Sequence, residues 1–131
     1  MNPVRVLIVE DVAVMRKVIH RALTLAGLRE MKVFEAENGQ KALDLLRVET
    51  VDLILLDLSM PVMGGLEFLE HRRAEGLAPN VPVVVVSGYN TRDRAEAVSK
   101  LGANAFILKP FTLGEIAERV LPLLDQSAKA A

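Results

Sequence analysis

Five short apolar runs, each separated from the next by a segment with helical periodicity, place the strongest constraint on how this chain can fold. The runs cover Val4–Val9, 32–36, 51–56, 83–86 and Ala105–Leu108. Three of them, VRVLIV, VDLILL and VVVV, are almost continuously apolar and rich in β-branched residues. Parallel strands that are buried on both faces beneath flanking helices have this composition. The runs therefore predict five buried parallel strands.

The segments between these runs carry apolar residues at helical spacing. One stripe consists of Met15, Val18, Ile19, Ala22, Leu23 and Ala26, and another of Leu113, Ile116, Ala117, Val120, Leu121 and Leu124. Each stripe would cover one side of a helix and face a core. Strand and helix then alternate five times, which predicts an α/β fold of the (βα)₅ type, with right-handed crossovers that place helices on both faces of the sheet.

The expected helix ends carry residues that commonly cap helices. Thr112 and Glu115 have the spacing of a capping box, and Asn38 and Thr91 are candidate N-caps. Three glycines follow helical segments, where a left-handed C-terminal residue costs least without a Cβ; they are Gly27, Gly76 and Gly102.

The length and charge of the chain fit one soluble domain. At 131 residues the chain has the size of a single domain, for which we predict residues 1–125, followed by a short tail at 126–131. The net charge of −1 gives no electrostatic reason to expect nucleic acid or anionic lipid as a partner. There is no cysteine, no signal peptide and no apolar run near the roughly 20 residues of a membrane span. We therefore expect a cytoplasmic protein.

Polar residues follow four of the five predicted strands. Glu10 and Asp11 come after the first strand and Asp57 after the third, while Ser87 follows the fourth and Lys109 the fifth. In doubly wound sheets, ligands bind outside the carboxyl ends of the strands. Each of these residues alone would be an ordinary cap or turn residue, but their joint occurrence at one edge predicts a functional site.

The residue types at this edge suit phosphoryl transfer. Three carboxylates this close repel one another unless a cation lies between them. Mg²⁺ meets this need, since it prefers oxygen ligands and commonly binds one or two carboxylates together with a phosphate. A carboxylate nucleophile, a metal, a lysine and a hydroxyl are the groups that attack a phosphoryl group and stabilise its oxygens.

The chain resembles the receiver domains of bacterial response regulators over essentially its whole length. The matching segments are LIVEDVAVMRKVI, EAENGQKALDLL, DLILLDLSMPVMGGLEFL, VVVVSGYN and GANAFILKPFT. The resemblance implies a flavodoxin-like sheet with strand order 2-1-3-4-5. It also implies a signalling switch rather than a dedicated enzyme, one that takes a phosphoryl group from a histidine kinase or phosphotransfer protein and then binds a protein target.

The resemblance assigns roles to the residues at the strand ends. Asp57 matches the phosphoacceptor, and Asp11 matches the carboxylate that binds Mg²⁺ directly. Glu10 matches an acidic neighbour that acts mostly through water, although aspartate is commoner there. The backbone carbonyl of Ser59 matches a further metal ligand.

The same resemblance implies a set of switch residues. Ser87 and Lys109 match the hydroxyl and the ammonium that bind the phosphoryl group, and Phe106 matches an aromatic side chain that moves inward on activation. The bond between Lys109 and Pro110 matches one that is cis in the family. The surface that changes on phosphorylation would be built from residues 91–101, Ala105–Leu108 and 112–124.

Two further positions match residues that set the lifetime of the phosphoryl group. Ser59 offers only a small hydroxyl near the acceptor, and Tyr89 is large enough to shield the acyl phosphate from water. Both features predict slow autodephosphorylation. An ordinary loop aromatic is the competing interpretation for Tyr89.

Three alternative functions compete with a free-standing switch. A hydrolase of the haloacid-dehalogenase type would carry a second aspartate where this chain has Ser59, and the chain has no segment for a cap domain. A degenerate receiver would lack one of the acid pair, the acceptor or the lysine, and all are present here. A receiver excised from a longer regulator or hybrid kinase, including one that acts as a phosphorelay intermediate, remains compatible with the sequence.

Overall fold

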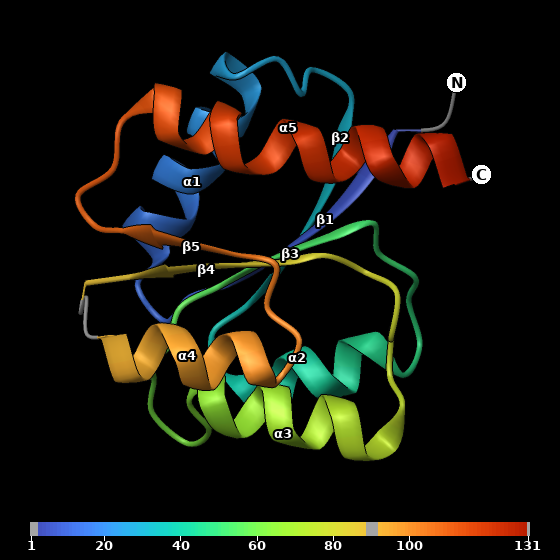
Figure 1. The fold of residues 1–131 in the computed structure, drawn as a ribbon, viewed down its shortest axis with the longest axis vertical. Helices are drawn as coiled ribbons and strands as arrows, with labels where there is room; N and C mark the ends of the chain where they lie inside the picture. Colours follow the sequence, from blue (N-terminus) through green and yellow to red (C-terminus); the bar gives the residue numbers. More distant parts are fainter. Residues whose placement is uncertain (1–2, 89–91, 131) are drawn as a thin grey trace.

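A five-stranded parallel sheet forms the centre of the computed structural model, which describes residues 3–88 and 92–130 (Figure 1). Its strands are β1 (Val4–Val9), β2 (Met31–Ala36), β3 (Leu53–Leu56), β4 (Val83–Ser87) and β5 (Ala105–Leu108). They pair in the order β2-β1-β3-β4-β5, and every neighbouring pair is parallel. This arrangement confirms the predicted flavodoxin-like α/β fold.

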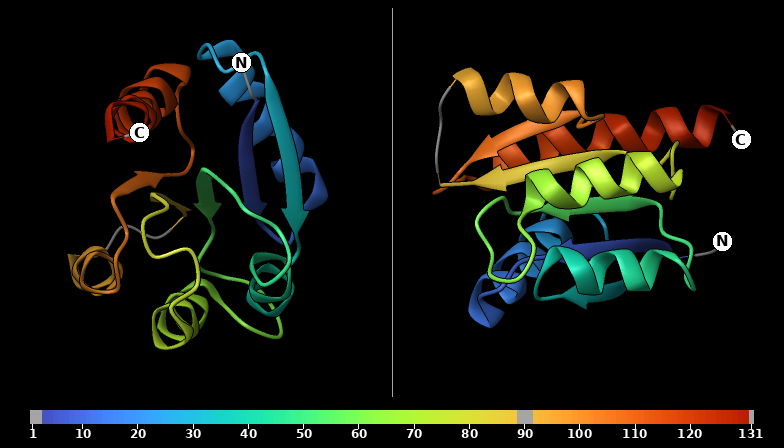
Figure 2. Two further views of the ribbon diagram at one scale, coloured as in Figure 1. Left: turned by 90° about the vertical axis from the view of Figure 1, so that its right-hand side faces the viewer. Right: turned by 90° about the horizontal axis from the view of Figure 1, so that it is seen from below.

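Five helices cover the two faces of this sheet. They are α1 (Ala13–Leu25), α2 (Gly39–Leu46), α3 (Gly65–Glu75), α4 (Arg92–Lys100) and α5 (Leu113–Ala130). Helices α1 and α5 lie on one face, and α2, α3 and α4 lie on the other (Figures 1 and 2). Among residues 3–88 and 92–130, no helix is long and apolar enough to span a membrane.

Each face of the sheet has its own hydrophobic core. One core contains Phe68 and Leu69 of α3 together with Leu7 and Val9 of β1. The other contains Ile8 of β1 with residues of α1 and α5. All residues of β3 and β4 are buried, because side chains of a central strand meet a helical layer on either side. This accounts for the unbroken apolar runs in the sequence.

Local capping fixes where several helices begin and end. The Asn38 side chain accepts a hydrogen bond from the backbone N–H of Lys41 (2.9 Å), and the Thr112 hydroxyl accepts one from the N–H of Glu115 (3.2 Å). Gly76 ends α3 with a φ of 65°, a left-handed conformation that glycine adopts at low cost. These predicted caps are confirmed, whereas Thr91 lies outside the described residues.

Helix α5 extends further than the sequence pattern predicts. It continues to Ala130 and so includes most of the predicted tail at 126–131. Gln126, Ala128 and Lys129 all have high helix propensity, so this stretch contains no residue that ends a helix. The residue at which the domain ends stays a prediction.

The start of α3 packs directly against the backbone that follows β3. The N–H of Gly65 donates to the carbonyl oxygen of Leu58 (3.0 Å). A Cβ at position 65 would lie only 2.4 Å from the carbonyl oxygen of Asp57, which is closer than real Cβ contacts allow. The absence of a side chain at Gly65 therefore sets the position of Asp57 relative to α3.

We predict that Gly65→Ala destabilises the protein by about 1–3 kcal/mol, because the added methyl group displaces backbone rather than a flexible side chain. Gly114→Ala is the matched control, since it also lies in the first turn of a helix and its nearest neighbour would be the Thr112 hydroxyl at 3.7 Å. The control should be neutral or more stable by up to about 1 kcal/mol. Urea unfolding measures both changes. Equal effects of the two substitutions would contradict this account of Gly65.

Candidate functional site

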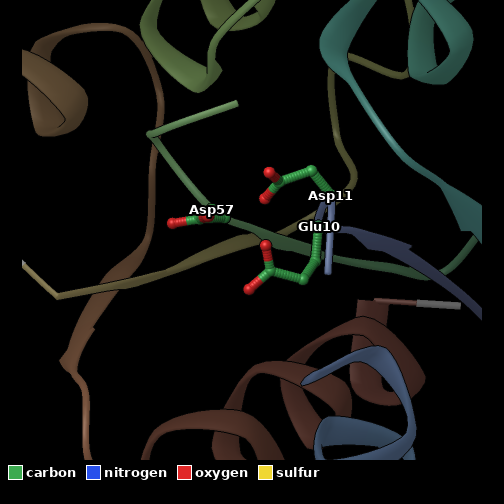
Figure 3. Close-up of side chains that lie close together, drawn as sticks. All are labelled: Glu10, Asp11 and Asp57. Atoms are coloured by element: carbon green, nitrogen blue, oxygen red, sulfur yellow. The ribbon is translucent and has the colours of Figure 1, made fainter. Parts of the chain in front are cut away.

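The carboxyl ends of four strands bring the predicted site residues together. Glu10 and Asp11 follow β1 and Asp57 follows β3; carboxylate oxygens of all three lie within 4.8 Å of one another (Figure 3). Ser87 ends β4 and is fully buried. Its carbonyl oxygen accepts a hydrogen bond from the N–H of Lys109 (2.8 Å), which follows β5. The sheet therefore gathers the predicted groups at one edge.

The Asp57 carboxylate is held in place by the backbone around it. The backbone N–H of Asp57 donates to the carbonyl oxygen of Val9 (2.9 Å), which ties the end of β3 to the end of β1. Its Oδ1 accepts a hydrogen bond from the N–H of Leu58 (2.8 Å). Only 7% of the residue is exposed. Asp57 thus presents a largely buried, oriented carboxylate to the site.

Lys109 forms its shortest ion pair with Glu10. Its Nζ lies 2.6 Å from Glu10 Oε1 and 3.7 Å from Asp57 Oδ1. Glu10 is only 1% exposed, and its second oxygen, Oε2, is buried with no hydrogen-bond partner in the part of the chain that the structure describes. The ammonium therefore compensates the charge of a buried carboxylate. A short movement would bring it to the predicted phosphoacceptor. Sequence reasoning did not predict this partner for Lys109.

Asp11 lies at the solvent side of the acidic group. Its pKa is raised above the usual aspartate value, chiefly by the neighbouring Glu10 carboxylate, to which a protonated Asp11 side chain would donate a hydrogen bond. Burial and the negative charge of Glu10 raise it further, while the Asp11 backbone and Lys109 act in the opposite direction. The group as a whole thus holds more negative charge than its surroundings neutralise.

The donor set at this edge fits a hard divalent cation. All the side-chain ligands are carboxylate oxygens, which Mg²⁺ prefers. The buried and unpartnered Oε2 of Glu10 lacks the partner that a polar atom inside a protein normally has. Glu10, Asp11 and Asp57 could therefore hold a metal ion between them, and a bound cation would relieve their mutual repulsion.

The structure describes three of the four remaining predicted residues, namely Ser59, Phe106 and Pro110. Ser59 is exposed just after Asp57, and no described contact tests its carbonyl as a ligand. Phe106 is half-buried and packs against the core beneath α2, α3 and α4. The bond between Lys109 and Pro110 is cis, as the resemblance implies. Tyr89 lies outside the described residues.

Arg16 is a site residue that sequence reasoning did not assign. Its Nη1 donates to the carbonyl oxygen of Glu10 (2.7 Å), and its Nε donates to Glu35 Oε1 (2.8 Å). Arg16 thereby fixes the backbone at the end of β1 and ties it to β2. The helical pattern alone does not distinguish this arginine from the exposed Lys17 beside it.

Comparisons with known proteins agree with this geometry. The family model described as response regulator receiver domain matches residues 6–121. A CheY homologue, a chemotaxis protein of Campylobacter jejuni subsp. jejuni, is 35% identical over 121 residues, which is 92% of each chain. A receiver domain protein described as CheY-like, from Methanospirillum hungatei JF-1, superposes with a TM-score of 0.86 at 28% identity, covering 99% of this chain and all of that one.

Another relative is much longer than this chain. A protein-glutamate methylesterase/protein-glutamine glutaminase of Treponema pallidum is 41% identical over 118 residues, which are 84% of this chain but only 27% of that protein. Related receiver domains thus occur both as short proteins and as parts of longer ones. By its fold, its site and the match over residues 6–121, this chain belongs to the response regulator receiver domains of two-component signalling.

Proposed function

We propose that this receiver domain is a phosphorylation-activated switch that accepts a phosphoryl group on Asp57 from a histidine kinase or phosphotransfer protein. The observation that carries the proposal is the arrangement at the sheet edge. A buried, oriented carboxylate has two further carboxylates within 4.8 Å and an ammonium 3.7 Å away. The free-standing receiver of C. jejuni, which this chain matches over 92% of its length, supports the same function.

Asp57 acts as the nucleophile in this proposal. Oδ1 already accepts a hydrogen bond from the Leu58 N–H, so we assign the attack on phosphorus to Oδ2. The bond from phosphorus to the donor nitrogen breaks as the bond to Oδ2 forms, and the product is an acyl phosphate. A carboxylate attacks through an oxygen that carries no proton, so this step needs no general base.

Glu10 and Asp11 would hold Mg²⁺ together with Asp57 and the backbone carbonyl of Ser59. When bound, the ion neutralises charge on the transferring phosphoryl oxygens. The unpartnered Oε2 of Glu10 supports this role, since the buried oxygen can accept a metal-bound water. Glutamate has one methylene more than aspartate, which suits a carboxylate that contacts the ion through a water molecule.

Lys109 and Ser87 would bind the phosphoryl group once it is attached. Lys109 need move only from Glu10 towards Asp57, and a phosphoryl group attracts its ammonium more strongly than a single carboxylate does. The Ser87 hydroxyl is a further donor at the end of the adjacent strand. Movement of these two residues would pass the structural change caused by phosphorylation to β4 and β5.

The output surface would comprise α4, β5 and α5. Among the described side chains of α4, only Val98 is fully buried, so little packing holds this helix in one position. Phe106 is half-buried beside a hollow lined by Val98, Ala103 and Ala105. We infer that Phe106 moves inward on phosphorylation and that a protein target binds the altered surface.

One observation favours a second candidate function. The T. pallidum methylesterase contains a related receiver as about a quarter of its length, with 27% of that protein matched. This chain would then be the regulatory domain of a longer response regulator. The phosphorylation chemistry would be unchanged, and the output surface would contact an attached domain instead of a separate protein.

We predict that acetyl phosphate with Mg²⁺ adds one phosphoryl group to the protein, on Asp57. Intact-mass analysis should detect the addition in the wild type. It should be absent in Asp57→Asn and after chelation of Mg²⁺, because the first lacks the nucleophile and the second lacks the charge stabilisation. Asp52→Asn is the control, since Asp52 is exposed at the opposite end of β3. Undiminished labelling of Asp57→Asn would exclude the assignment.

Lys109→Ala should destabilise the unphosphorylated protein by roughly 1–3 kcal/mol, because Glu10 loses its closest charged partner. The double variant Glu10→Gln/Lys109→Ala should regain much of this loss, since position 10 then carries no charge that needs the ammonium. Urea unfolding in the presence of a chelator measures both. In a separate pull-down, beryllofluoride with Mg²⁺ should not promote target binding of the folded Lys109→Ala protein. A wild-type response would exclude the switch role of Lys109.

We predict that Ser59→Asn and Tyr89→Ala each accelerate loss of the phosphoryl group by a factor of about ten to a hundred. An amide at position 59 would orient the attacking water, and removal of the Tyr89 ring would expose the acyl phosphate. Ser99→Asn, an exposed position in α4, is the control. Radiolabel decay measures all three. Unchanged decay in Tyr89→Ala would leave Tyr89 as an ordinary loop aromatic.

A further inference from the structure

Helix α3 carries a charged residue in its buried stripe. Its buried residues are Gly65, Phe68, Leu69 and Arg72, which follow the spacing of a core-facing helix surface. Arg72 is only 6% exposed, although this position would ordinarily hold an apolar side chain. Burying a guanidinium among hydrocarbon is costly unless it is fully partnered. The presence of Arg72 at this position therefore requires an explanation.

The contacts of Arg72 account for only part of its side chain. Its Nη2 donates to the carbonyl oxygens of Ala78 (2.5 Å) and Val81 (2.9 Å), which anchors the loop between α3 and β4. Its Nε is buried and has no hydrogen-bond partner among the described residues. None of the ion pairs of the described residues involves Arg72. Burial lowers the pKa of the guanidinium, with no carboxylate to oppose the effect.

A cavity adjoins this partly satisfied arginine. It has a volume of about 190 Å³ and is lined by Arg72, Arg73, Leu77, Pro79, Leu101 and Gly102. It lies where α3 and α4 end, and because these helices run back against the direction of the parallel strands, their ends lie at the other edge of the sheet from Asp57, which follows β3. A Cβ at Gly102 would be 3.8 Å from Nη1 of Arg72, so this nitrogen lies at the cavity wall.

The chemistry of the lining selects one class of ligand. Two arginines supply positive charge, none of the described residues that line the cavity is acidic, and Leu77, Pro79 and Leu101 provide an apolar surface. Two carbonyl oxygens in the last turn of α3 already accept hydrogen bonds, from the N–H groups of Gly76 (3.2 Å) and Leu77 (3.0 Å). These bonds limit the repulsion between the carbonyl oxygens and an anion. A carboxylate matches a guanidinium in shape and charge, and a short aliphatic body fits the apolar wall.

We propose that this cavity binds a small carboxylate with a short aliphatic body, whose carboxylate pairs with Arg72. The Nη1 of Arg73 donates to the carbonyl oxygen of Lys100, the last residue of α4, so the cavity wall already links α3 to α4. A bound acid would contact Leu101 and Gly102 directly after α4. It would thereby restrain the helix that forms part of the output surface. The site is independent of the chemistry at Asp57.

Backbone amide chemical shifts of the unphosphorylated protein, without Mg²⁺, test this proposal. Butyrate should shift the amides of residues 72–79 and 100–103 in a saturable manner, and the isosteric amide butyramide should not. N-acetylleucine and its amide form a second pair, which represents the carboxyl terminus of a peptide. Saturation by butyrate but not by N-acetylleucine identifies a free acid as the ligand, and the reverse identifies a peptide terminus. Failure of Asp57 labelling would leave this measurement unaffected.

Three variants complete the test. Arg72→Leu should weaken butyrate binding by at least about tenfold, because the charge-assisted pair is lost. Leu101→Phe keeps Arg72 but fills the cavity, and it should abolish the saturable shifts even if Arg72→Leu does not fold. Arg29→Leu, which removes an exposed arginine elsewhere, should bind like the wild type. Shifts that do not saturate, equal binding of butyramide, or wild-type affinity in Arg72→Leu or Leu101→Phe would overturn the proposal.

Discussion

Burial of both faces of the parallel sheet is the constraint on which the rest of this structure depends. Every residue of β3 and β4 is shielded by helices, so a polar side chain cannot be placed within these strands without losing its solvation. In these two strands, polar groups are therefore confined to the positions where the strands end. Since the strands are parallel, those positions meet at a single edge. The same burial that stabilises the fold thus concentrates Glu10, Asp57 and Lys109 in one small region.

The charged side chains of that region do not neutralise one another. Three carboxylates and one ammonium leave two negative charges among groups that are mostly withdrawn from water. Lys109 reduces this excess by pairing with Glu10, while the Asp57 carboxylate accepts a hydrogen bond from a backbone N–H and has the ammonium at a longer distance. A divalent cation would bring the sum to zero. Because the ammonium has two alternative carboxylate neighbours, a change of charge at Asp57 alters which of them it favours. Geometry and charge together make the position of the Lys109 ammonium sensitive to the charge at Asp57.

The apolar pattern predicted the five strands, their parallel arrangement and the edge that carries the site. Its main error in strand length was at 51–56, because the Asp52 side chain accepts a hydrogen bond from the N–H of Arg5 (2.8 Å) and the paired strand begins only at Leu53. The pairing of Lys109 with Glu10 joins residues 99 positions apart, so no local pattern encodes it. Val62 is likewise unexpected: it is exposed with a φ of 68°, which β-branched residues rarely adopt.

Three charged side chains are buried among the described residues, and two of them, Glu10 and Arg72, have very different partners. Glu10 has an ammonium at 2.6 Å, and its spare oxygen faces a region where a cation fits. Arg72 has only two loop carbonyls, whose partial charges do not balance a full positive charge. An apolar residue of similar volume would satisfy the buried stripe of α3 without this desolvation cost. Hydrogen bonds to the loop carbonyls account for one nitrogen of the guanidinium, Nη2. The cavity beside Nη1 is where an anion would supply the missing charge, which is why the exception in α3 indicates a second site.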